Sequence, residues 1–502
     1  MKQYDIIVIG SGAGLIVMES AIAMGLSVAI VERSKFGGTC LNRGCIPSKM
    51  LVYPADMIRE AALAHRVGVH LGTPAADWDV IAQRMWAQIH HSEQLAQNLR
   101  DFPGVDVYEA NAEFADPHTL RLTFPAPQAD ALIAAKRIVV AAGARSFVPP
   151  IPGLAETGYI TSETFFGALF PKAPWKRLII IGGGAIGAEF AHIFSAFGSK
   201  VTVVEMRQRL IATEEEEISH FVEKQFVHNG IEVLTNHKTL SASKQNGEKV
   251  LLVQDTATGQ TRSIPTDEIF IASGVRSNSD QLHCEVAGIA MDDKGWIITN
   301  EYLETSQDHI FAIGDINGLY QFRHKANYEA GLLSHNLFSG GEKRAACYNA
   351  VPWAIFTWPQ VGHVGLTEQE AKQQGLKVRT AVNYYSNVVA GIAMGFSQQD
   401  EDNGFVKIII GEDKRILGAH VVGPHAAVLV QPFVYLMNAG LSCDLAQPPA
   451  AERPLQRERR LIRRNCISTG TVMPIMNSMV IHPSFNELTA WALENVDWND
   501  EQ

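Results

Sequence analysis

Two glycine-rich segments constrain the fold of this 502-residue chain more than any other feature. The first, residues 10–15 (GSGAGL), lies between the continuous apolar run 6–9 and a helical stretch, and a second apolar run ends at Glu32. A glycine-rich turn between a buried strand and a helix brings backbone N–H groups and the helix dipole onto a pyrophosphate, and an acidic residue about twenty positions further on accepts a hydrogen bond from a ribose hydroxyl. The segment therefore predicts a dinucleotide-binding unit. Its expected contacts are Gly10, Gly12, Gly14 and Glu32.

The second segment, residues 182–187 (GGGAIG), repeats this arrangement after the apolar run 178–181. The next strand ends at Glu205, and two complete units in one chain imply two bound dinucleotides. Glu205 would repel a 2′-phosphate and favours NAD over NADP, although Arg207 and Arg209 could meet such a phosphate. The expected contacts of this unit are Gly182, Gly184, Gly187 and Glu205.

Composition and charge are those of a globular protein. Apolar residues make up 46% of the chain and charged residues 19%, and the length suits three or four domains. The net charge of −11 argues against a general binder of nucleic acid or of an anionic membrane. The most apolar later run, residues 419–437, is interrupted by Pro424, His425 and Pro432, so we expect no membrane span.

The six cysteines further limit the possible metal and redox chemistry. Apart from Cys40 and Cys45 they show no metal-like spacing, so no zinc site is indicated. Few cysteines in a long chain favour a reducing compartment, where a single disulfide is more often catalytic than structural. Residues 1–5 run directly into a strand, which leaves no room for a signal or transit peptide. We therefore expect a cytoplasmic protein.

Residues 37–49 (GGTCLNRGCIPSK) carry the cysteine pair. The spacing lets the sulfurs of Cys40 and Cys45 meet across the distorted start of a helix, within the Cα separation that a disulfide allows. The N-terminus of a helix also stabilises thiolate over thiol. A pair of ordinary buried cysteines is the alternative. The surrounding glycines, and Pro47 and Lys49 at the start of a helix, favour the redox-active interpretation.

Together with the two dinucleotide units, this segment resembles the redox-active segment of the class I pyridine nucleotide-disulfide oxidoreductases, the flavoproteins that include dihydrolipoamide dehydrogenase, glutathione reductase and mycothione reductase. The resemblance covers nearly the whole chain. One departure is Arg43, which stands where a small apolar residue is usual. The resemblance implies an α/β fold with two Rossmann-like dinucleotide-binding domains, one for FAD and one for NAD, and an α+β C-terminal dimerisation domain that makes a homodimer.

The same resemblance divides the chain into four segments. Residues 1–150 would form the first part of the FAD-binding domain with the redox disulfide, residues 151–280 the NAD-binding domain, and residues 281–350 the second, central part of the FAD-binding domain. Residues 351–502 would form the dimerisation domain. Within it, residues 448–469 carry six arginines where relatives have a shorter connection. An exposed basic loop is expected there, with a docking surface for an acidic partner as the alternative.

Catalytic roles also follow from the resemblance. Cys45 would lie against the flavin, and Cys40 would face the substrate. His482 and Glu487, in the segment HPSFNE, match an acid–base dyad that the partner subunit contributes to the disulfide. The glutamate would bond to one ring nitrogen, fix the tautomer and stabilise the imidazolium.

Further contacts would surround the two nucleotides. Lys49, paired with Glu189, would stand near the flavin N5 and tune the electronics of the ring. Gly274, after a strand at residues 268–272, would lie in the loop that returns the chain from the NAD unit. The remaining expected flavin-binding positions are Gly38, Thr39, Lys49, Ala110, Ala142, Gly143, Asp315 and His324.

Two other patterns bear on the fold. Apolar residues recur with helical spacing between residues 50 and 99, which predicts two helices with a role in the core. The run of four glutamates at residues 214–217 is most simply the solvated start of a helix.

The implied activity is oxidation of dihydrolipoamide by NAD, with the lipoyl domain of a 2-oxoacid dehydrogenase complex as a candidate partner. NAD(P)H-dependent reduction of a small disulfide of mycothione or glutathione type is the alternative. Leu15 favours that alternative: it replaces the third glycine of the first turn, as in mycothione-reductase-like sequences, and predicts slightly wider packing of helix on strand. The absence of a C-terminal vicinal cysteine pair argues against mercuric reductase. A third interpretation is a flavin-binding partner subunit with little turnover, since residues 448–469 could misplace His482.

Overall fold

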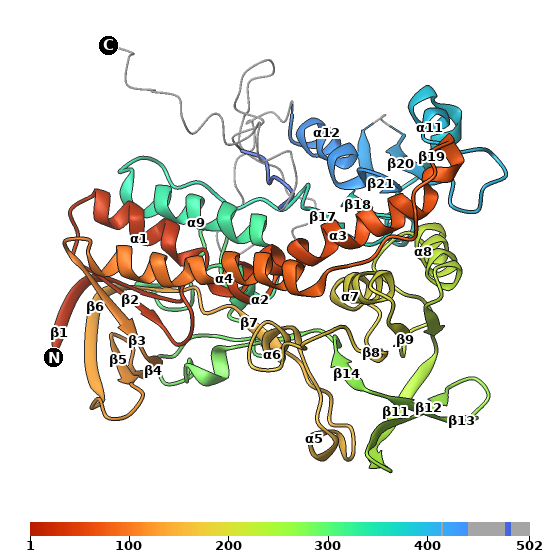
Figure 1. The fold of residues 1–502 in the computed structure, drawn as a ribbon. Coiled ribbons are helices and arrows are strands. Elements are labelled where there is room, and N and C mark those ends of the chain that lie inside the picture. The colour runs from red at the N-terminus through yellow and green to blue at the C-terminus, as the bar shows by residue number, and fades with distance from the viewer. Residues whose placement is uncertain (413–414, 440–476, 483–502) are drawn as a thin grey trace.

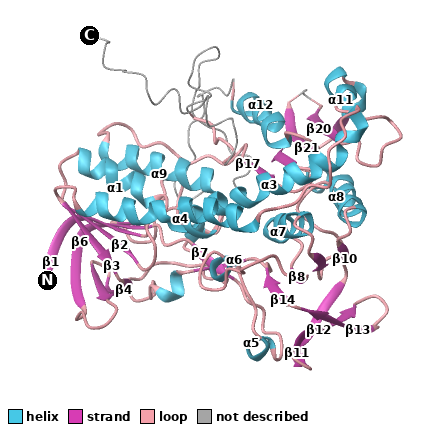
Figure 2. Ribbon diagram, in the orientation of Figure 1, coloured by secondary structure: helices cyan, strands magenta, loops and turns pink. Residues whose placement is uncertain are grey.

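The computed structural model describes residues 1–412, 415–439 and 477–482, and its sheets are flanked by helices (Figure 1; Figure 2). The strands of the largest sheet are β1 (Lys2–Ile9), β2 (Val28–Glu32), β3 (Val105–Glu109), β4 (Asn111–Asp116), β5 (Thr119–Thr123), β6 (Ala131–Val140) and β16 (Ile310–Ala312). They lie in the order β3-β2-β1-β6-β5-β4, with β16 paired in parallel to β6. The chain therefore leaves this sheet after β6 and returns much later to complete it.

The centre of this sheet is buried on both faces, as the apolar run at residues 6–9 predicts. Ile6, Ile7 and Val8 are fully buried in β1, and the neighbouring β2 and β6 run parallel to it. Helix α1 (Gly14–Ala23) follows β1 and lies beside α9 (Arg323–Phe338) (Figure 1). A Cβ at Gly14 would lie 2.6 Å from Val8 Cγ1. Gly14 therefore provides a close approach of helix to strand next to Leu15, and the slightly wider packing expected from Leu15 stays a prediction.

A second parallel sheet carries the other glycine-rich turn. Its strands are β8 (Arg177–Ile181), β9 (Lys200–Val204), β10 (Glu232–Leu234) and β14 (Glu268–Ile271), and its helices are α7 (Ala185–Ala196) and α8 (Glu216–His228). The strand order is β10-β9-β8-β14. An antiparallel sheet of β11 (His237–Gln245), β12 (Glu248–Asp255) and β13 (Thr261–Thr266) extends from it, and β7 (Ala144–Ser146) pairs with β15 (Val275–Ser277) where the chain enters and leaves.

The C-terminal part of the described chain is an antiparallel sheet. Its strands are β17 (Pro352–Ile355), β18 (Val361–Gly365), β19 (Val378–Tyr384), β20 (Phe405–Gly411) and β21 (Ile416–Val422), in the order β17-β18-β21-β20-β19. Helix α12 (Ala426–Asn438) packs on β18 and β21, with Val430 and Val434 fully buried. Residues 477–482 contact this helix, because Gln431 bonds to the backbone of Met479 and Ile481.

Long helices link the two sheets that carry the glycine-rich turns and the C-terminal sheet. Helix α3 (Cys45–Leu63) contacts both α4 (Trp78–Arg100) and α7. Helices α3 and α4 confirm the two helices predicted between residues 50 and 99. Asp77 caps α4, because its side chain accepts a hydrogen bond from Val80 N–H at 3.1 Å. No helix within the described residues is both long and apolar enough to cross a bilayer. The shorter elements are α2 (Gly38–Arg43), η1 (Ala64–Val67), α5 (Leu154–Thr157), α6 (Ser162–Phe165), η2 (Ser279–Gln281), η3 (Gly314–Asn317), α10 (Glu368–Gln373), η4 (Tyr385–Asn387) and α11 (Val389–Ala393).

Only the second half of the glutamate run at residues 214–217 is a solvated helix start, because Glu216 and Glu217 are exposed in the first turn of α8. Glu214 is only 3% exposed, and its carboxylate lies 3.1 Å from His363 Nδ1 and 2.6 Å from His420 Nδ1. Glu215 is also buried and accepts a hydrogen bond from Lys407 Nζ at 2.9 Å. The expectation of solvation is wrong for these two residues, because the C-terminal sheet supplies buried partners that outweigh the cost of removing carboxylates from water.

Candidate active site

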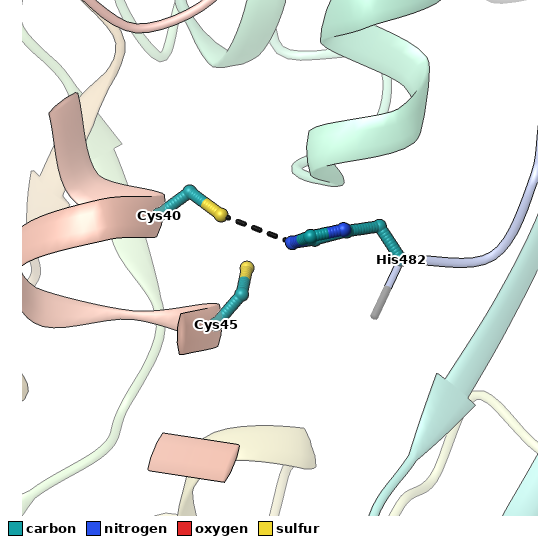
Figure 3. Close-up of side chains that lie close together, drawn as sticks. All are labelled: Cys40, Cys45 and His482. Carbon is teal, nitrogen blue, oxygen red and sulfur yellow. Dashed lines mark hydrogen bonds between the residues drawn. The ribbon is translucent and has the colours of Figure 1, made fainter. Parts of the chain in front are cut away.

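The two cysteines lie side by side at a break between α2 and α3 (Figure 3). Gly44 ends α2 with φ −139° and ψ −118°, so the chain interrupts the helix and restarts it at Cys45. Gly37 precedes α2 at φ +97°, a conformation that favours glycine. Both sulfurs are free thiols in this structure. The break therefore presents a reduced pair with the spacing that the sequence predicted.

The two thiols are electrostatically distinct. The hydrogen bond with Cys40 lowers the pKa of Cys45 to about 6 against the effect of burial, and the nearby charges of Lys49 and His482 act in the same direction. The same hydrogen bond, together with burial, raises the pKa of Cys40 well above the ordinary thiol value. In the reduced pair, Cys45 is therefore the thiolate and Cys40 the thiol that donates to it.

His482 brings an imidazole to the pair. Its Nε2 lies 3.3 Å from Cys40 Sγ, and its ring points at that sulfur (Figure 3). This histidine belongs to the same chain as Cys40, whereas the resemblance implied the partner subunit's histidine. Residues 477–482 pack against α12 of their own chain, with Ile481 almost fully buried in the core, and the histidine expected from the partner subunit stays a prediction. Glu487 and the arginine-rich residues 448–469 lie outside the described residues.

Lys49 and Glu189 meet as the family resemblance implied. Lys49 Nζ lies 2.7 Å from Glu189 Oε2, although the two positions are 140 residues apart along the chain. The other carboxylate oxygen accepts a hydrogen bond from Phe356 N–H at 3.0 Å, and Lys49 Nζ lies 4.5 Å from the centre of the Phe356 ring. The pair therefore ties α3 to α7 and to the C-terminal sheet directly behind the cysteines.

A cavity beside the cysteines collects most of the expected flavin-binding positions. Both Cys40 and Cys45 contribute to its wall. Gly38 packs closely on the first turn, since a Cβ there would lie 2.8 Å from Gly12 Cα. The predicted residues that line the cavity are Gly10, Gly12, Glu32, Gly38, Thr39, Ala110, Ala142, Gly143 and Asp315.

This lining suits a dinucleotide that reaches the thiols. Glu32 is held at the cavity wall by Ser11, whose hydroxyl and N–H donate to its carboxylate at 2.7 and 3.0 Å. A carboxylate can accept further hydrogen bonds, so a ribose hydroxyl can still bind. Burial raises the pKa of Asp315 to about 6, against the opposing charge of Lys325. The residues present therefore fit a flavin nucleotide.

Three predicted flavin contacts lie elsewhere. Among the described residues, Gly14, Lys49 and His324 are not part of the cavity lining. His324 is buried against the C-terminal sheet, where its Nε2 bonds to the carbonyl oxygen of Pro352 at 2.8 Å. Ser11 and Arg323 do line the cavity and were not predicted. Ser11 lies inside the glycine turn and could have been inferred from its place there.

The second glycine-rich turn is closely packed. Gly182 has φ +110°, and a Cβ at Gly187 would lie 1.9 Å from Gly182 O. Glu205 accepts hydrogen bonds from the N–H groups of Gly183 and Arg207, both at 2.7 Å. The other predicted positions, Gly184 and Gly274, lie at the start of α7 and directly before β15. These residues form a second strand–turn–helix unit with its acidic residue at the turn.

Comparisons with known proteins identify the class. Residues 4–330 match the pyridine nucleotide-disulphide oxidoreductase family, and residues 351–460 match the dimerisation domain of the same family. The chain belongs to this family of oxidoreductases, whose members bind FAD and a pyridine nucleotide. The predicted architecture of two nucleotide-binding domains and a C-terminal dimerisation domain is confirmed.

Individual relatives span several activities. The chain is 34% identical to mycothione reductase of Mycobacterium tuberculosis, with 88% of this chain and 94% of the relative covered. It is 32% identical to dihydrolipoyl dehydrogenase of Chlamydia muridarum, with 86% and 89% covered. Among solved structures, the HOCl-induced flavoprotein disulfide reductase RclA from Escherichia coli is similar with a TM-score of 0.74 and 28% identity, with 89% of this chain and 98% of that chain covered.

Proposed function

We propose that this oxidoreductase interconverts a dithiol and a disulfide through Cys40 and Cys45, and that its activity is oxidation of dihydrolipoamide with NAD. The observation that carries the proposal is the cluster of two thiols and an imidazole on the wall of the dinucleotide cavity, with His482 Nε2 3.3 Å from Cys40 Sγ.

The exchange begins with the disulfide form of the pair. His482 accepts the proton of a substrate thiol, and the resulting thiolate attacks Cys40, so that a mixed disulfide forms and Cys45 leaves as a thiolate. The second substrate thiol then attacks the substrate sulfur bonded to Cys40. Cys40 leaves and takes up the proton of that thiol, which releases the cyclic disulfide and leaves the reduced pair. The low pKa of Cys45, about 6, suits it to be the leaving thiolate.

The cavity-lining residues would hold FAD, with the flavin beside Cys45. When bound, FAD supplies the two-electron chemistry that links the thiols to a pyridine nucleotide. Lys49 keeps a positive charge next to the Cys45 thiolate, and Glu189 fixes the position of that charge through the 2.7 Å ion pair. Glu205 would bond to the nicotinamide nucleotide's ribose and so favour NAD over NADP.

A second candidate is reduction of a small disulfide of mycothione type by NAD(P)H. The 34% identity to mycothione reductase over 88% of the chain favours it. The same residues serve in reverse: Cys40 attacks the disulfide substrate, and His482 donates a proton to the leaving thiolate. The lipoyl domain of a 2-oxoacid dehydrogenase complex is a partner only under the first candidate.

Steady-state turnover of the FAD-loaded protein tests the proposal. We expect NADH formation from dihydrolipoamide and NAD that exceeds the rate of NAD(P)H oxidation by mycothione disulfide or glutathione disulfide. The Cys40→Ser variant should lose all of these activities, while it still oxidises NADH with a dye that needs no thiol. A higher rate with mycothione disulfide would select the second candidate. No turnover with any of these substrates would contradict both candidates and favour a partner subunit with little activity.

Mixing two inactive variants tests which subunit supplies the histidine. In the structure Cys40 and His482 belong to one chain, so co-expression of Cys40→Ser with His482→Ala should yield no active site in a mixed dimer. If the partner's histidine is used, as the family resemblance implies, one site of each mixed dimer has both residues. Recovery of roughly a quarter of the wild-type turnover, as random pairing of the two chains predicts, would therefore contradict the arrangement within one chain.

A further inference from the structure

We infer that Gln431 is the positioning residue for His482, an inference that rests on the proposed proton-transfer role of that histidine. Gln431 lies on α12 and is fully buried. Its Nε2 donates to the carbonyl oxygen of Met479 at 3.2 Å, and its Oε1 accepts from the N–H of Ile481 at 3.1 Å. The Gln431 side chain therefore holds the backbone at Met479 and at Ile481, three positions and one position before His482.

The chemistry of the contact suits an amide. The backbone offers one acceptor and one donor, and the planar amide of Gln supplies a donor and an acceptor together without depending on a protonation state. The contact is buried, with Gln431 at 0% and Ile481 at 1% exposure, so a lost hydrogen bond is poorly replaced by water. An apolar side chain of the same size would fill the space and leave both backbone groups without this partner.

Packing and hydrogen bonding have different tasks in this segment. Ile481 packs in the main core and Met479 packs with Tyr348 and Val351, so apolar contacts hold the segment against the protein. Apolar contacts are not directional. The amide of Gln431 fixes the position of the backbone along the segment, and His482 is the next residue. A small shift of this backbone would move His482 Nε2 away from Cys40 Sγ. Catalysis by proton transfer tolerates little displacement, so such a shift would lower activity.

The place of Gln431 on a buried helix supports this role. Helix α12 packs on β18 and β21, and the neighbouring helix residues Val430 and Val434 are fully buried. The amide therefore projects from a rigid element, as precise positioning requires. The same clamp would orient His482 whether the histidine serves its own chain or a partner's site.

The rate of Cys40 alkylation as a function of pH tests the inference. The reduced FAD-loaded protein is treated with iodoacetamide, and the modified peptide is quantified by mass spectrometry. Gln431→Leu keeps most of the side-chain volume and removes both hydrogen bonds, and Gln431→Met is a second variant should the first not fold. Gln225→Leu is the matched control, since Gln225 is also buried and bonds to a backbone carbonyl, that of Glu401, at 2.8 Å.

We expect Gln431→Leu to lower the alkylation rate at neutral pH about tenfold and to move the pH profile upward by about one unit, as loss of the imidazole from the thiol would. His482→Ala should behave in the same way, and the double variant should be no worse than His482→Ala alone. Gln225→Leu should keep the wild-type profile. A wild-type profile in folded Gln431→Leu would overturn the inference. So would a Gln431→Leu substitution that lowers the alkylation rate as much in the His482→Ala background as in the wild type. An unchanged profile in His482→Ala would instead contradict the proposed role of the histidine.

Discussion

The two dinucleotide-binding units share one turn geometry. Gly10 has φ +99°, and a Cβ there would lie 2.4 Å from Ala141 O. Gly182 has φ +110°, and a Cβ there would lie 2.4 Å from Ala272 O. In each unit the turn is pressed against the end of the neighbouring parallel strand. The contact geometry that admits a phosphate is therefore the same in both halves of the molecule.

The units differ in how the acidic residue is held. Glu32 is 7% exposed and accepts from both the hydroxyl and the N–H of Ser11. Glu205 is half-buried, bonds only to the backbone N–H groups of Gly183 and Arg207 in the described structure, and is followed by the exposed side chain of Arg207. The first unit thus has the fixed, enclosed wall that suits a resident cofactor beside the thiols. The second presents exposed charges that can select between exchanging nucleotides.

The largest expected effects come from filling the two turns. Gly10→Ala and Gly182→Ala each place a methyl group against a backbone oxygen at positive φ, with backbone strain of about 1–3 kcal/mol before the clash is counted. Gly10→Ala should lose bound FAD and all activity. Gly182→Ala should keep its flavin absorbance and lose reduction by NADH.

Gly25→Ala is the control for these variants, since Gly25 has φ +71° with no atom within 4 Å of the added Cβ. It should keep both FAD and NADH reduction. Flavin content after purification and the rate of flavin bleaching by NADH check all three variants. Loss of FAD from Gly182→Ala would mean that the two units are not functionally separate.

The next largest effect concerns Glu214, which links the second unit to His363 and His420 of the C-terminal sheet. Burial alone would raise the pKa of Glu214, but the charges and hydrogen bonds of His420 and His363 lower it overall. Glu214 therefore contributes stability above its unfolded pKa, 4.5, and loses it as the pH falls. Glu214 raises the pKa of His420 against the effect of burial. The stability that His420 contributes is therefore complete below pH 6.5, its unfolded pKa, and is lost as the pH rises.

Glu214→Gln should accordingly reduce the free energy of unfolding by about 3 kcal/mol near pH 6, because it breaks a buried charged cluster. Glu216→Gln, in the same run but with its side chain 62% exposed, should change it by less than about 0.5 kcal/mol. Urea unfolding between pH 4 and pH 9 measures both. Equal effects of the two substitutions would show that the buried cluster does not stabilise the fold.

The smallest expected effect is on the preference for NAD over NADP. Removing the carboxylate in Glu205→Ala should lower the ratio of kcat/KM for NADH to that for NADPH by about tenfold, since a hydrogen bond to a charged group is worth about 1.5–3 kcal/mol. Arg207→Ala should change the ratio in the opposite direction and by less. Initial rates with both nucleotides check the pair. An unchanged ratio in Glu205→Ala would show that the ribose contact was misassigned.

Local features of this molecule were predictable from the sequence. The buried strand at residues 6–9, both glycine turns and the spacing of Cys40 and Cys45 follow from periodicity and from the conformations that glycine allows. The pairing of Lys49 with Glu189 was predicted only through the family resemblance, because no local pattern joins positions 140 residues apart.

Features that depend on distant partners were not predictable. Glu214 looks like any acidic residue before a helix, and its partners His363 and His420 lie 149 and 206 positions away. Gln431 is an unremarkable polar residue in an apolar helix until the fold brings residues 479–481 to it. Packing across sheets decides these cases, and a single sequence carries no local record of it.

In the proposed reaction, electrons pass between the cysteine pair and a flavin that lies against Cys45. Anaerobic addition of one equivalent of NADH to the FAD-loaded protein tests it most directly by absorbance. We predict a long-wavelength band from the Cys45 thiolate beside oxidised flavin, present in the wild type and absent in Cys45→Ser. Simple bleaching of the flavin in the wild type, without that band, would contradict the account.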